Sequence, residues 1–345
     1  MTALKKVPDN IENLLIRSAN WIGDAIMTTP AVRAIRKNFP YAQISVLAKP
    51  WVASVFNNNP HIDHVLLYNA KGPRGTFEVA GMLEKHCFDG AILFQNAFEA
   101  AWVAYLGKIP VRVGYDTDLR RTLLSHPVKR SSQILKLHQI HYYNGILEGV
   151  GLKTDGMRME LYLSAHDHNS ALKILEAAGI TQADRLIGIN PSAFFGTAKQ
   201  WFPERFARVA DRINQKFGTK TIIFGGPNDQ ELGGNILTMM KTSAINLSGK
   251  TTLEEAMAII ARCRLFITND SGLMHIAAAL NVPEIAIFGS TNFAVTAPWN
   301  PRARVVRSRV QCSPCMKRQC PFGHKECMKN ISVEKVFSVA CQLIQ

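Results

Sequence analysis

Short apolar runs alternate with longer helical patterns along almost the whole length of this 345-residue chain. In the first half, apolar runs typical of buried strands lie at residues 13–19, 44–48, 65–68, 90–94, 111–114 and 161–163. Patterns with helical periodicity separate them, at residues 25–39, 77–86, 97–106 and 138–150. Strands that alternate with helices in this way predict a parallel sheet covered by helices on both faces.

The same alternation starts again in the second half, after a polar stretch that becomes helical within residues 164–179. Strand patterns lie at residues 186–190, 221–224, 245–247, 265–267 and 284–288, and helical patterns at residues 203–217, from 229 onward, 252–263 and 331–344. The chain is long enough for two hydrophobic cores. We therefore predict an α/β protein of two Rossmann-like, doubly wound domains that face a central cleft.

The predicted domain boundaries lie where the alternation is interrupted. They give an N-terminal domain at 1–165, a linker at 166–182, a C-terminal domain at 183–330 with a cysteine-rich loop at 311–328, and a terminal helix at 331–345 that packs back across the domains. In doubly wound sheets, ligands bind beyond the carboxyl ends of the strands. A cleft between two domains is the usual place for such a site.

Residues 265–280, with the sequence LFITNDSGLMHIAAAL, predict a strand that turns sharply into a helix. The turn passes through Asp270, Ser271 and Gly272, and the first N–H groups of the following helix have no partner within it. The helix dipole is positive at the same end, so the turn can bind phosphate. The alternative is an ordinary capped turn, in which Asp270 or Ser271 is only the N-cap.

A second polar segment follows the strand predicted at 186–190. Ser192 and Thr197 carry hydroxyls that can donate to phosphate oxygens, and Lys199 adds a compact positive charge. The alternative for Lys199 is a solvated loop lysine. Because the carboxyl ends of parallel strands lie at one edge of a sheet, we favour a phosphate role for Lys199 beside the turn at 270–272.

Gly225 and Gly226 form a tight turn before two acidic residues, Asp229 and Glu231, an arrangement suited to a ribose diol. The alternative is a helix N-terminus with acids in its first turn. No GxGxxG pattern follows the first strand, and the sequence holds no Walker motif. A nicotinamide-dependent enzyme and a P-loop kinase are therefore disfavoured.

In the first half, Asp24 stands just after a strand and at the start of a helix, where Gly23 permits close approach of a substrate. A carboxylate there can act as general base for a sugar hydroxyl, or it can merely pair with the helix dipole. Gln95 and Asn96 follow another strand and offer amides for hydroxyl recognition or for an N-cap. Arg120 can contact an anionic acceptor or remain solvated.

The net charge of +14 predicts an acidic partner. Residues 302–329 hold eight Lys or Arg and one acid, about half of the excess, and the rest is dispersed. Basic and aromatic residues do not interleave as they do in single-strand binders, so nucleic acid is disfavoured against a membrane surface or a phosphorylated acceptor. No apolar run reaches the length of about 18 residues that spans a bilayer, and no secretory signal begins the chain, so we expect a cytoplasmic protein.

Four cysteines lie close together in the sequence, at Cys312, Cys315, Cys320 and Cys327, with His324 among them. The density of thiols is compatible with a structural zinc site. The spacing is not that of paired CxxC motifs, so a reduced cluster without metal stays open as the alternative. Stable disulfides are not expected in a cytosolic chain.

Five stretches of the chain together resemble the ADP-heptose:lipopolysaccharide heptosyltransferases, and among them the heptosyltransferase II group. They are residues 20–24 (NWIGD), 95–98 (QNAF), 190–203, 269–275 (NDSGLMH) and 312–324. The Asp-Ser-Gly-x-x-His pattern is common to the family, whereas the NWIGD start and the cysteine cluster are typical of the second group. The resemblance spans nearly the whole chain and implies the two-domain glycosyltransferase fold called GT-B.

The resemblance also implies roles for single residues: Asp24 as the catalytic base and Lys199 as the catalytic lysine on the donor phosphates. With the residues argued above, the predicted donor-binding set is Ser192, Thr197, Lys199, Glu231, Thr251, Asp270, Ser271, Gly272 and His275. The predicted acceptor-binding set is Asn20, Trp21, Gln95, Asn96 and Arg120.

The activity that the resemblance implies is inverting transfer of heptose from ADP-L-glycero-D-manno-heptose to a heptose of the lipopolysaccharide inner core. The C-terminal domain would bind the donor and the N-terminal domain the lipid-linked core, with no cofactor and with peripheral contact to the cytoplasmic face of the inner membrane. Two alternatives stay open. One is a related glycosyltransferase that uses another nucleotide sugar or core position, and the other is a non-enzymatic basic binding module.

Overall fold

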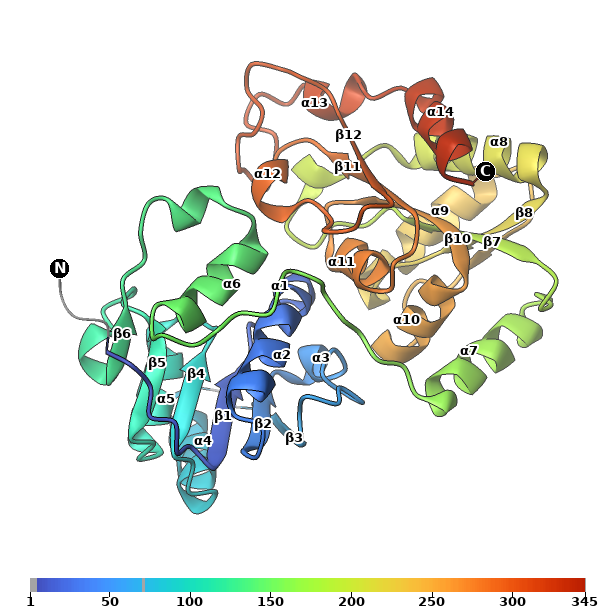
Figure 1. Cartoon of the computed structure of the whole chain (residues 1–345). Coiled ribbons are helices and arrows are strands. Elements are labelled where there is room, and N and C mark those ends of the chain that lie inside the picture. The colour runs from blue at the N-terminus through green and yellow to red at the C-terminus, as the bar shows by residue number, and fades with distance from the viewer. Residues whose placement is uncertain (1–4, 70–71, 345) are drawn as a thin grey trace. The chain divides into compact units, whose positions relative to one another are not determined.

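The computed structural model describes residues 5–69 and 72–344, and the chain divides into two compact units between Tyr162 and Leu163. Each unit is built on a six-stranded sheet in which all neighbouring strands are parallel (Figure 1). Helices connect the strands in both units, because a parallel pair needs a crossover connection. The α/β prediction is therefore confirmed for both halves.

The first unit has the strand order β3-β2-β1-β4-β5-β6. Its strands are β1 (Asn13–Arg17), β2 (Gln43–Ala48), β3 (His64–Leu67), β4 (Gly90–Leu93), β5 (Val111–Tyr115) and β6 (His126–Val128). Its α-helices are α1 (Ile22–Met27), α2 (Thr29–Asn38), α3 (Pro50–Ala53), α4 (Gly72–Lys85), α5 (Phe98–Leu106) and α6 (Gln139–Glu148). Two short 3₁₀ helices, η1 (Arg121–Leu123) and η2 (Ile134–Lys136), lie between β5 and α6.

Two expectations for the first unit are wrong. The single helix expected at 25–39 is split into α1 and α2, because Pro30 has no N–H and suits only the first turn of a new helix. The strand that closes the sheet is β6, paired with β5, whereas residues 161–163 belong to no strand. The sequence pattern did not predict β6, because it contains Pro127 and proline argues against a strand. Proline is nevertheless tolerated on an edge strand such as β6.

The second unit has the strand order β12-β11-β10-β7-β8-β9. Its strands are β7 (Arg185–Asn190), β8 (Thr219–Ile223), β9 (Ala244–Asn246), β10 (Cys263–Asn269), β11 (Glu284–Phe288) and β12 (Ala303–Arg307). Its α-helices are α7 (Ala165–Ala177), α8 (Pro203–Phe217), α9 (Gln230–Met239), α10 (Leu253–Ala261), α11 (Gly272–Ala279), α12 (Phe293–Thr296), α13 (Glu326–Lys329) and α14 (Val333–Ile344). The 3₁₀ helices η3 (Thr197–Lys199) and η4 (Pro227–Asp229) precede α8 and α9.

Two segments of the second unit differ from the expected boundaries. Most of the linker expected at 166–182 is helix α7, which begins with a capping box between Ser164 and Asp167 and packs against α10. The terminal helix α14, expected to pack back across the domains, packs against α8, β10 and β11 of its own unit. Its apolar face, which includes Val336 and Ala340, is part of that unit's core and fixes it there.

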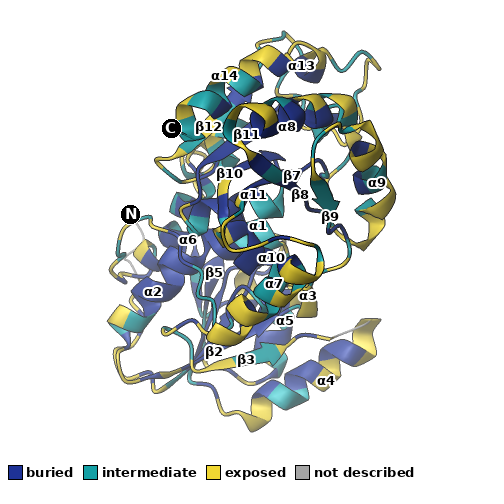
Figure 2. Cartoon of the chain, turned by 90° about the vertical axis from the view of Figure 1, so that its right-hand side faces the viewer, coloured by how far each residue is buried: buried dark blue, intermediate teal, exposed yellow. Residues whose placement is uncertain are grey.

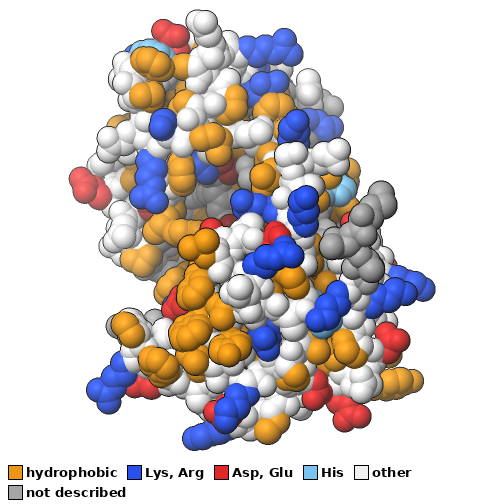
Figure 3. Space-filling view, turned by 90° about the vertical axis from the view of Figure 1, so that its left-hand side faces the viewer, with side chains coloured by type: hydrophobic (Ala, Val, Ile, Leu, Met, Phe, Trp, Pro, Cys, Tyr) orange, Lys and Arg blue, Asp and Glu red, His pale blue; other side chains and the backbone are white. Residues whose placement is uncertain are grey.

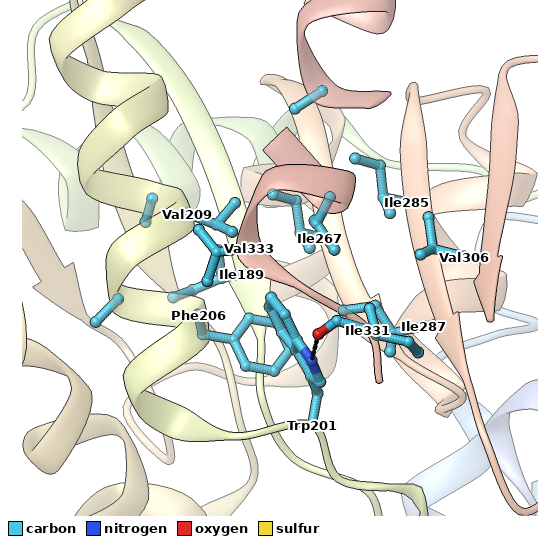
Figure 4. Close-up of a cluster of buried hydrophobic side chains, with 14 of the residues drawn as sticks. Ile189, Trp201, Phe206, Val209, Ile267, Ile285, Ile287, Val306, Ile331 and Val333 are labelled. Carbon is cyan, nitrogen blue, oxygen red and sulfur yellow. Dashed lines mark hydrogen bonds between the residues drawn. The ribbon is translucent and has the colours of Figure 1, made fainter. Parts of the chain in front are cut away.

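The strands of both units are mostly buried, whereas helices such as α4 and α9 expose one side (Figure 2). In the second unit, the core gathers around Trp201, which is 1% exposed. Its indole packs edge-on against Phe206 at 5.1 Å between ring centroids, and Nε1 donates to the Ile331 carbonyl at 3.0 Å (Figure 4). The core therefore anchors the chain just after the loop that carries Lys199.

The two sheets share one connection scheme, and it defines where a ligand is expected. In the first unit the strand order reverses between β1 and β4, and in the second between β7 and β10. At such a reversal in a doubly wound sheet, the connections leave to opposite sides, and ligands bind beyond the carboxyl ends of the strands there. The segments after β1, β4, β7 and β10 hold most of the predicted site residues.

Candidate functional site

In the second unit, hydrogen bonds join the carboxyl ends of β7 and β10. Asn190 and Thr268 are register partners at these ends. The Asn190 amide donates to Thr268 Oγ1 at 3.1 Å and to Ser271 Oγ at 2.8 Å. Ser271 is also the N-cap of α11 and accepts from the Met274 N–H at 3.4 Å. The Asn190 side chain therefore fixes the start of α11 beside the end of β7.

Lys199 and Asp270 lie together at this edge of the sheet. Lys199 Nζ is 2.6 Å from Asp270 Oδ2, and the two side chains are 14% and 7% exposed. The Thr291 hydroxyl, which follows β11, donates to the same carboxylate oxygen at 2.6 Å. Asp270 thus holds the ammonium of Lys199 next to the first residues of α11. An ammonium has three N–H donors, so the ion pair leaves two for a ligand.

The loop that carries Lys199 is anchored on both sides. Beyond it, the Trp201 N–H donates to Asn269 Oδ1 at 3.0 Å, and the Asn269 amide donates to the Pro191 carbonyl at 2.7 Å. Asn269 is the last residue of β10 and precedes Asp270. The hydrogen bonds therefore tie the Lys199 loop to the strand that carries its carboxylate partner.

A second support comes from the cysteine-rich loop. The Arg318 carbonyl accepts the Ala198 N–H at 3.0 Å, and the Arg318 guanidinium lies 5.5 Å from the centre of the Phe195 ring. Lys199 Nζ lies 4.9 Å from the same ring centre. Gly196 has φ +153°, and a Cβ there would come within 2.2 Å of the Arg318 carbonyl oxygen. Only glycine lets the two loops approach this closely.

The other predicted donor-binding residues of these segments differ in exposure. Ser192 is half-buried after β7, and Thr197 is exposed as the first residue of η3. Gly272 is the first residue of α11, and His275 is buried one turn into that helix. Ser192, Thr197 and Gly272 are therefore at least partly accessible, whereas His275 is buried.

The remaining predicted donor-binding residues, Glu231 for the ribose and Thr251, lie after β8 and β9. Glu231 is exposed in the first turn of α9, and Thr251 is half-buried just before the N-cap of α10. Asp229, the other acid of this turn, accepts the Gly226 N–H at 2.7 Å and is used in capping. This leaves Glu231 as the acid of this turn that faces solvent.

In the first unit, Asp24 lies in the first turn of α1, half-buried. The Tyr143 hydroxyl, from α6, donates to Asp24 Oδ1 at 3.0 Å. Burial, with the neighbouring Asp24 carboxylate as a second cause, raises the pKa of Tyr143 well above its usual value. The phenol therefore stays protonated and orients the carboxylate of Asp24.

Asn20 and Trp21 precede α1 and differ in their surroundings. The Asn20 side-chain oxygen accepts from Arg17 Nη2 at 2.9 Å, and its backbone carbonyl accepts from Trp51 Nε1 at 2.9 Å. Trp21 is 54% exposed. Trp21 is therefore a surface side chain, whereas Asn20 joins Arg17 and Trp51 by hydrogen bonds.

The prediction that Arg120 contacts an acceptor is wrong, because its side chain is completely buried. Its guanidinium donates to the Tyr115 carbonyl at 2.8 Å, to the Gln95 carbonyl and to Asn96 Oδ1 at 3.1 Å. The Asn96 amide nitrogen donates to Tyr142 Oη at 2.7 Å. Burial lowers the pKa of Arg120 to about 10. Arg120 and Asn96 therefore hold the loop after β4 in place from inside, and Gln95 is half-buried on that loop.

The four clustered cysteines are all free thiols. Within residues 5–69 and 72–344, no three His, Cys, Asp or Glu side chains are grouped so that they could hold a metal ion. The Cys320 sulfur accepts the Lys325 N–H at 3.4 Å, and such backbone N–H groups lower the pKa of Cys320. Burial raises the pKa of Cys327. In the structure, the loop supports its neighbours through Arg318, and a zinc ion bound to these thiols stays a prediction.

Sequence analysis did not identify two residues of these sites, Thr291 and Tyr143. Thr291 stands shortly after β11. The rule that selected Lys199 and Asp24, polar residues just beyond strand ends, would have found it. Tyr143 had no such signal, because it lies within α6 and meets Asp24 only in the folded unit.

The distribution of basic side chains and the length of the helices are relevant to the expected nucleic-acid and membrane partners. Lys and Arg side chains are scattered over the face shown in Figure 3 and form no continuous stripe there. Among the helices formed by the described residues, none has the length and apolar character needed to cross a membrane.

Comparison with known proteins gives one consistent family. Residues 77–326 match the profile of glycosyltransferase family 9 (heptosyltransferase). Lipooligosaccharide heptosyltransferase 2 of Campylobacter jejuni is 30% identical, over 96% of this chain and 98% of that protein. Lipopolysaccharide heptosyltransferase 2 of Escherichia coli K12 is 27% identical, over 94% of this chain and 96% of that protein.

A solved structure agrees with these relatives. The structure of E. coli ADP-heptose LPS heptosyltransferase II superposes with a TM-score of 0.84 and 25% identity, over 96% of this chain and 98% of that chain. The match covers both units, so the two Rossmann-like units have the GT-B type of fold.

Proposed function

The chain belongs to glycosyltransferase family 9, the heptosyltransferase family, and we propose that it transfers heptose from ADP-L-glycero-D-manno-heptose to a heptose of the lipopolysaccharide inner core. The relatives named heptosyltransferase 2 support a heptose of the lipopolysaccharide inner core as the acceptor, because they match over nearly their full length. The observation that best supports donor binding is the ion pair between Lys199 and Asp270 at the start of α11.

The donor half of the site has the chemistry that a leaving diphosphate requires. Lys199 and the first N–H groups of α11 supply positive potential at one edge of the sheet. The hydroxyls of Ser192, Thr197 and Ser271 are further donors. Preorganised donors of this kind stabilise a developing negative charge by roughly 3 kcal/mol each. We assign neutralisation of the diphosphate to these groups, so no cofactor is required.

The acceptor half depends on Asp24. Its carboxylate takes the proton from a heptose hydroxyl of the core while that oxygen bonds to the anomeric carbon of the donor. The bond from the anomeric carbon to the diphosphate oxygen breaks on the opposite face, so the configuration inverts and ADP leaves. The hydroxyl of Tyr143 holds Asp24 in one orientation for this step.

The remaining residues of the donor set have supporting roles in the proposal. Glu231 binds the ribose diol, because it is an exposed acid just beyond β8. Thr251 contacts the nucleotide from the loop before α10, and His275 braces the turn from inside. Exposed Trp21 and half-buried Gln95 line the path of the acceptor sugar on the first unit.

The acceptor is linked to a lipid, so the enzyme works at a membrane surface. We propose peripheral contact with the cytoplasmic face of the inner membrane, supported by the net charge of +14. Anionic lipids attract basic surfaces by about 1 kcal/mol per Lys or Arg near the surface. Nucleic acid is not a partner in this proposal.

A panel of nucleotide sugars tests the donor assignment. ADP-heptose, ADP-glucose, UDP-glucose and GDP-mannose are each added to the protein, and the thermal unfolding midpoint is recorded. A donor at 100 times its Kd stabilises the folded state by about 2.7 kcal/mol. We expect stabilisation by ADP-heptose and ADP, and transfer of heptose to a heptose-terminated core. Stabilisation by a UDP- or GDP-sugar alone would favour a related glycosyltransferase, and no stabilisation by any of them would favour a binding module.

A further inference from the structure

Two cations of the first unit lie on one aromatic ring. The guanidinium carbon of Arg17 is 4.4 Å from the centre of the Tyr68 ring, and Lys49 Nζ is 4.1 Å from it. Arg17 is 3% exposed, whereas Lys49 is half-buried and can be reached from solvent. Each cation gains from the ring, but the two like charges repel each other.

The three residues come from neighbouring strands at one edge of the sheet. Arg17 ends β1, Lys49 follows β2, and Tyr68 follows β3, and these strands are adjacent and parallel in the order β3-β2-β1. Arg17 Nη2 donates to Asn20 Oδ1 at 2.9 Å. The cation pair is therefore joined to the segment that leads to Asp24 in α1.

No carboxylate neutralises the pair directly. In the part of the chain that the structure describes, no acidic oxygen lies within 4.0 Å of a side-chain nitrogen of Arg17 or Lys49. The charge of Glu99 raises the pKa of both cations, but its carboxylate accepts from the Tyr68 hydroxyl at 2.5 Å instead. Arg17 Nε, which is buried, has no hydrogen-bond partner.

The charges are costly in these surroundings. Burial, and secondly the charge of Arg17, lowers the pKa of Lys49, and burial lowers the pKa of Arg17 to about 10. Among the described residues, Glu99 is the one acid whose charge acts on both cations, and it forms an ion pair with neither. The two cations therefore leave a net positive charge at the sheet edge. A bound anion would relieve the repulsion and pair with the accessible ammonium of Lys49.

We propose that the Arg17–Lys49 pair is an anion subsite of the acceptor, which takes a phosphate or a carboxylate carried by the core sugar chain. The subsite rests on the proposed function, since it assumes a glycan acceptor on the first unit. Lys49 contacts the anion, and Arg17 strengthens the field and holds Asn20. We assign the subsite to the acceptor, because the second unit already holds residues that suit the donor diphosphate.

The test replaces Lys49 rather than Arg17, because Arg17 is buried and its loss would disturb the core. Lys49→Met removes the charge and keeps the length, and Lys49→Arg keeps the charge. Lys85→Met is the matched control, since Lys85 is an exposed lysine at the end of α4, which leads to the amino end of β4. Thermal unfolding midpoints establish that the variants fold.

Transfer is measured with a heptose-terminated core oligosaccharide at saturating ADP-heptose. Loss of a charge-assisted hydrogen bond predicts that K49M raises the acceptor KM about tenfold or more, with the donor KM unchanged. K49R restores most of the affinity, and K85M matches the wild type. An unchanged acceptor KM in K49M, or an equal rise in the donor KM, would overturn the proposal.

Two further arms identify the anion and separate the proposals. With a phosphatase-treated oligosaccharide, the difference between wild type and K49M disappears if the partner is a phosphate and persists if it is a sugar carboxylate. If the wild type transfers no heptose, the proposed function fails. Calorimetry then measures the affinity of wild type and K49M for the same oligosaccharide, which tests the subsite independently of transfer activity. Equal affinities would reject the subsite.

Discussion

A single carboxylate, that of Asp270, holds the positive charge of Lys199 at the proposed donor-binding edge of the second unit. Asp270 Oδ2 accepts from both Lys199 and Thr291, so the lysine ammonium is held where α11 begins. A lysine in a mobile loop would lose side-chain entropy of up to about 2 kcal/mol on binding a phosphate. With Lys199 already ordered by Asp270, the donor does not have to supply that cost.

Lys199→Ala should weaken donor binding and leave the fold intact. A hydrogen bond to a charged group contributes about 1.5–3 kcal/mol, so we expect the Kd of ADP-heptose to rise roughly 10- to 100-fold. Isothermal titration of the variant measures this Kd. Lys173→Ala, on the exposed side of α7, is the control. Equal affinity of K199A and wild type would remove Lys199 from the donor site.

Asp24→Asn should separate binding from chemistry. The amide keeps the size of the side chain and can still meet the Tyr143 hydroxyl, but it cannot accept a proton from the acceptor. Loss of a general base lowers kcat by about 10²- to 10⁴-fold, with the donor Kd unchanged. Asp9→Asn, exposed ahead of β1, controls for the change of charge. Near wild-type kcat in D24N would show that another group takes the proton.

At the scale of elements, the proposed donor site lies where two loops touch. The loop from β7 to α8 carries Lys199, and the cysteine-rich loop between β12 and α13 supports it through the Arg318 carbonyl. Gly196 allows this contact because no side chain stands between the loops. The cysteine-rich loop therefore acts on the donor site as a structural support.

Gly196→Ala should disturb this support. The new Cβ would meet the Arg318 carbonyl oxygen at 2.2 Å, and the residue would keep an unfavourable positive φ. Overpacking costs about 1–3 kcal/mol, so the loop should shift and weaken binding of ADP-heptose by about tenfold. Gly234→Ala is the control, because α9 has open space there and alanine favours a helix. If both variants bind the donor equally well, the loop contact does not position Lys199.

For the whole molecule, one buried acid should govern part of the pH dependence of stability. Glu284, at the start of β11, is completely buried, and burial raises its pKa well above the usual value. A carboxyl whose pKa is higher in the folded state keeps a proton that the unfolded chain loses. The free energy of unfolding therefore falls as the pH rises above about 4.5.

Glu284→Gln should remove that loss. The variant should be more stable than the wild type at pH 7.5, and the difference should vanish as the pH falls toward 4, where the acid is protonated in both states. Urea denaturation across this pH range measures the effect. Glu176→Gln, exposed on α7, should show no such trend. A constant difference between E284Q and wild type at all pH values would contradict the assignment.

The charge of the whole chain should be visible at lipid surfaces. With a net charge of +14, the protein should sediment with vesicles of anionic phospholipid at low salt. About 0.5 M salt should release it, because the Debye length then falls to a few ångströms. Phosphatidylcholine vesicles are the control. Equal, salt-resistant binding to both vesicles would mean that apolar contact, not charge, attaches the protein.

The sequence alone was enough to determine the α/β class and the restart of the pattern in the second half, and it predicted the segments of the candidate site. These follow from local signals: apolar periodicity, turn residues and polar side chains just beyond strand ends. The helix α8 at Pro203–Phe217 and the strand β11 at Glu284–Phe288 have the predicted bounds, because each is a strong apolar pattern with clear ends. The stretch at 265–280 has the predicted strand, turn and helix.

Only the tertiary structure decided which predicted residues meet. Arg120 has the same local pattern as a surface arginine, but it is buried against carbonyls that come from other segments. The pairing of Lys199 with Asp270, and of Tyr143 with Asp24, joins residues far apart in the chain. Local sequence sets what each segment can form, whereas burial and ion pairing depend on the order in which the sheet brings the strand ends together.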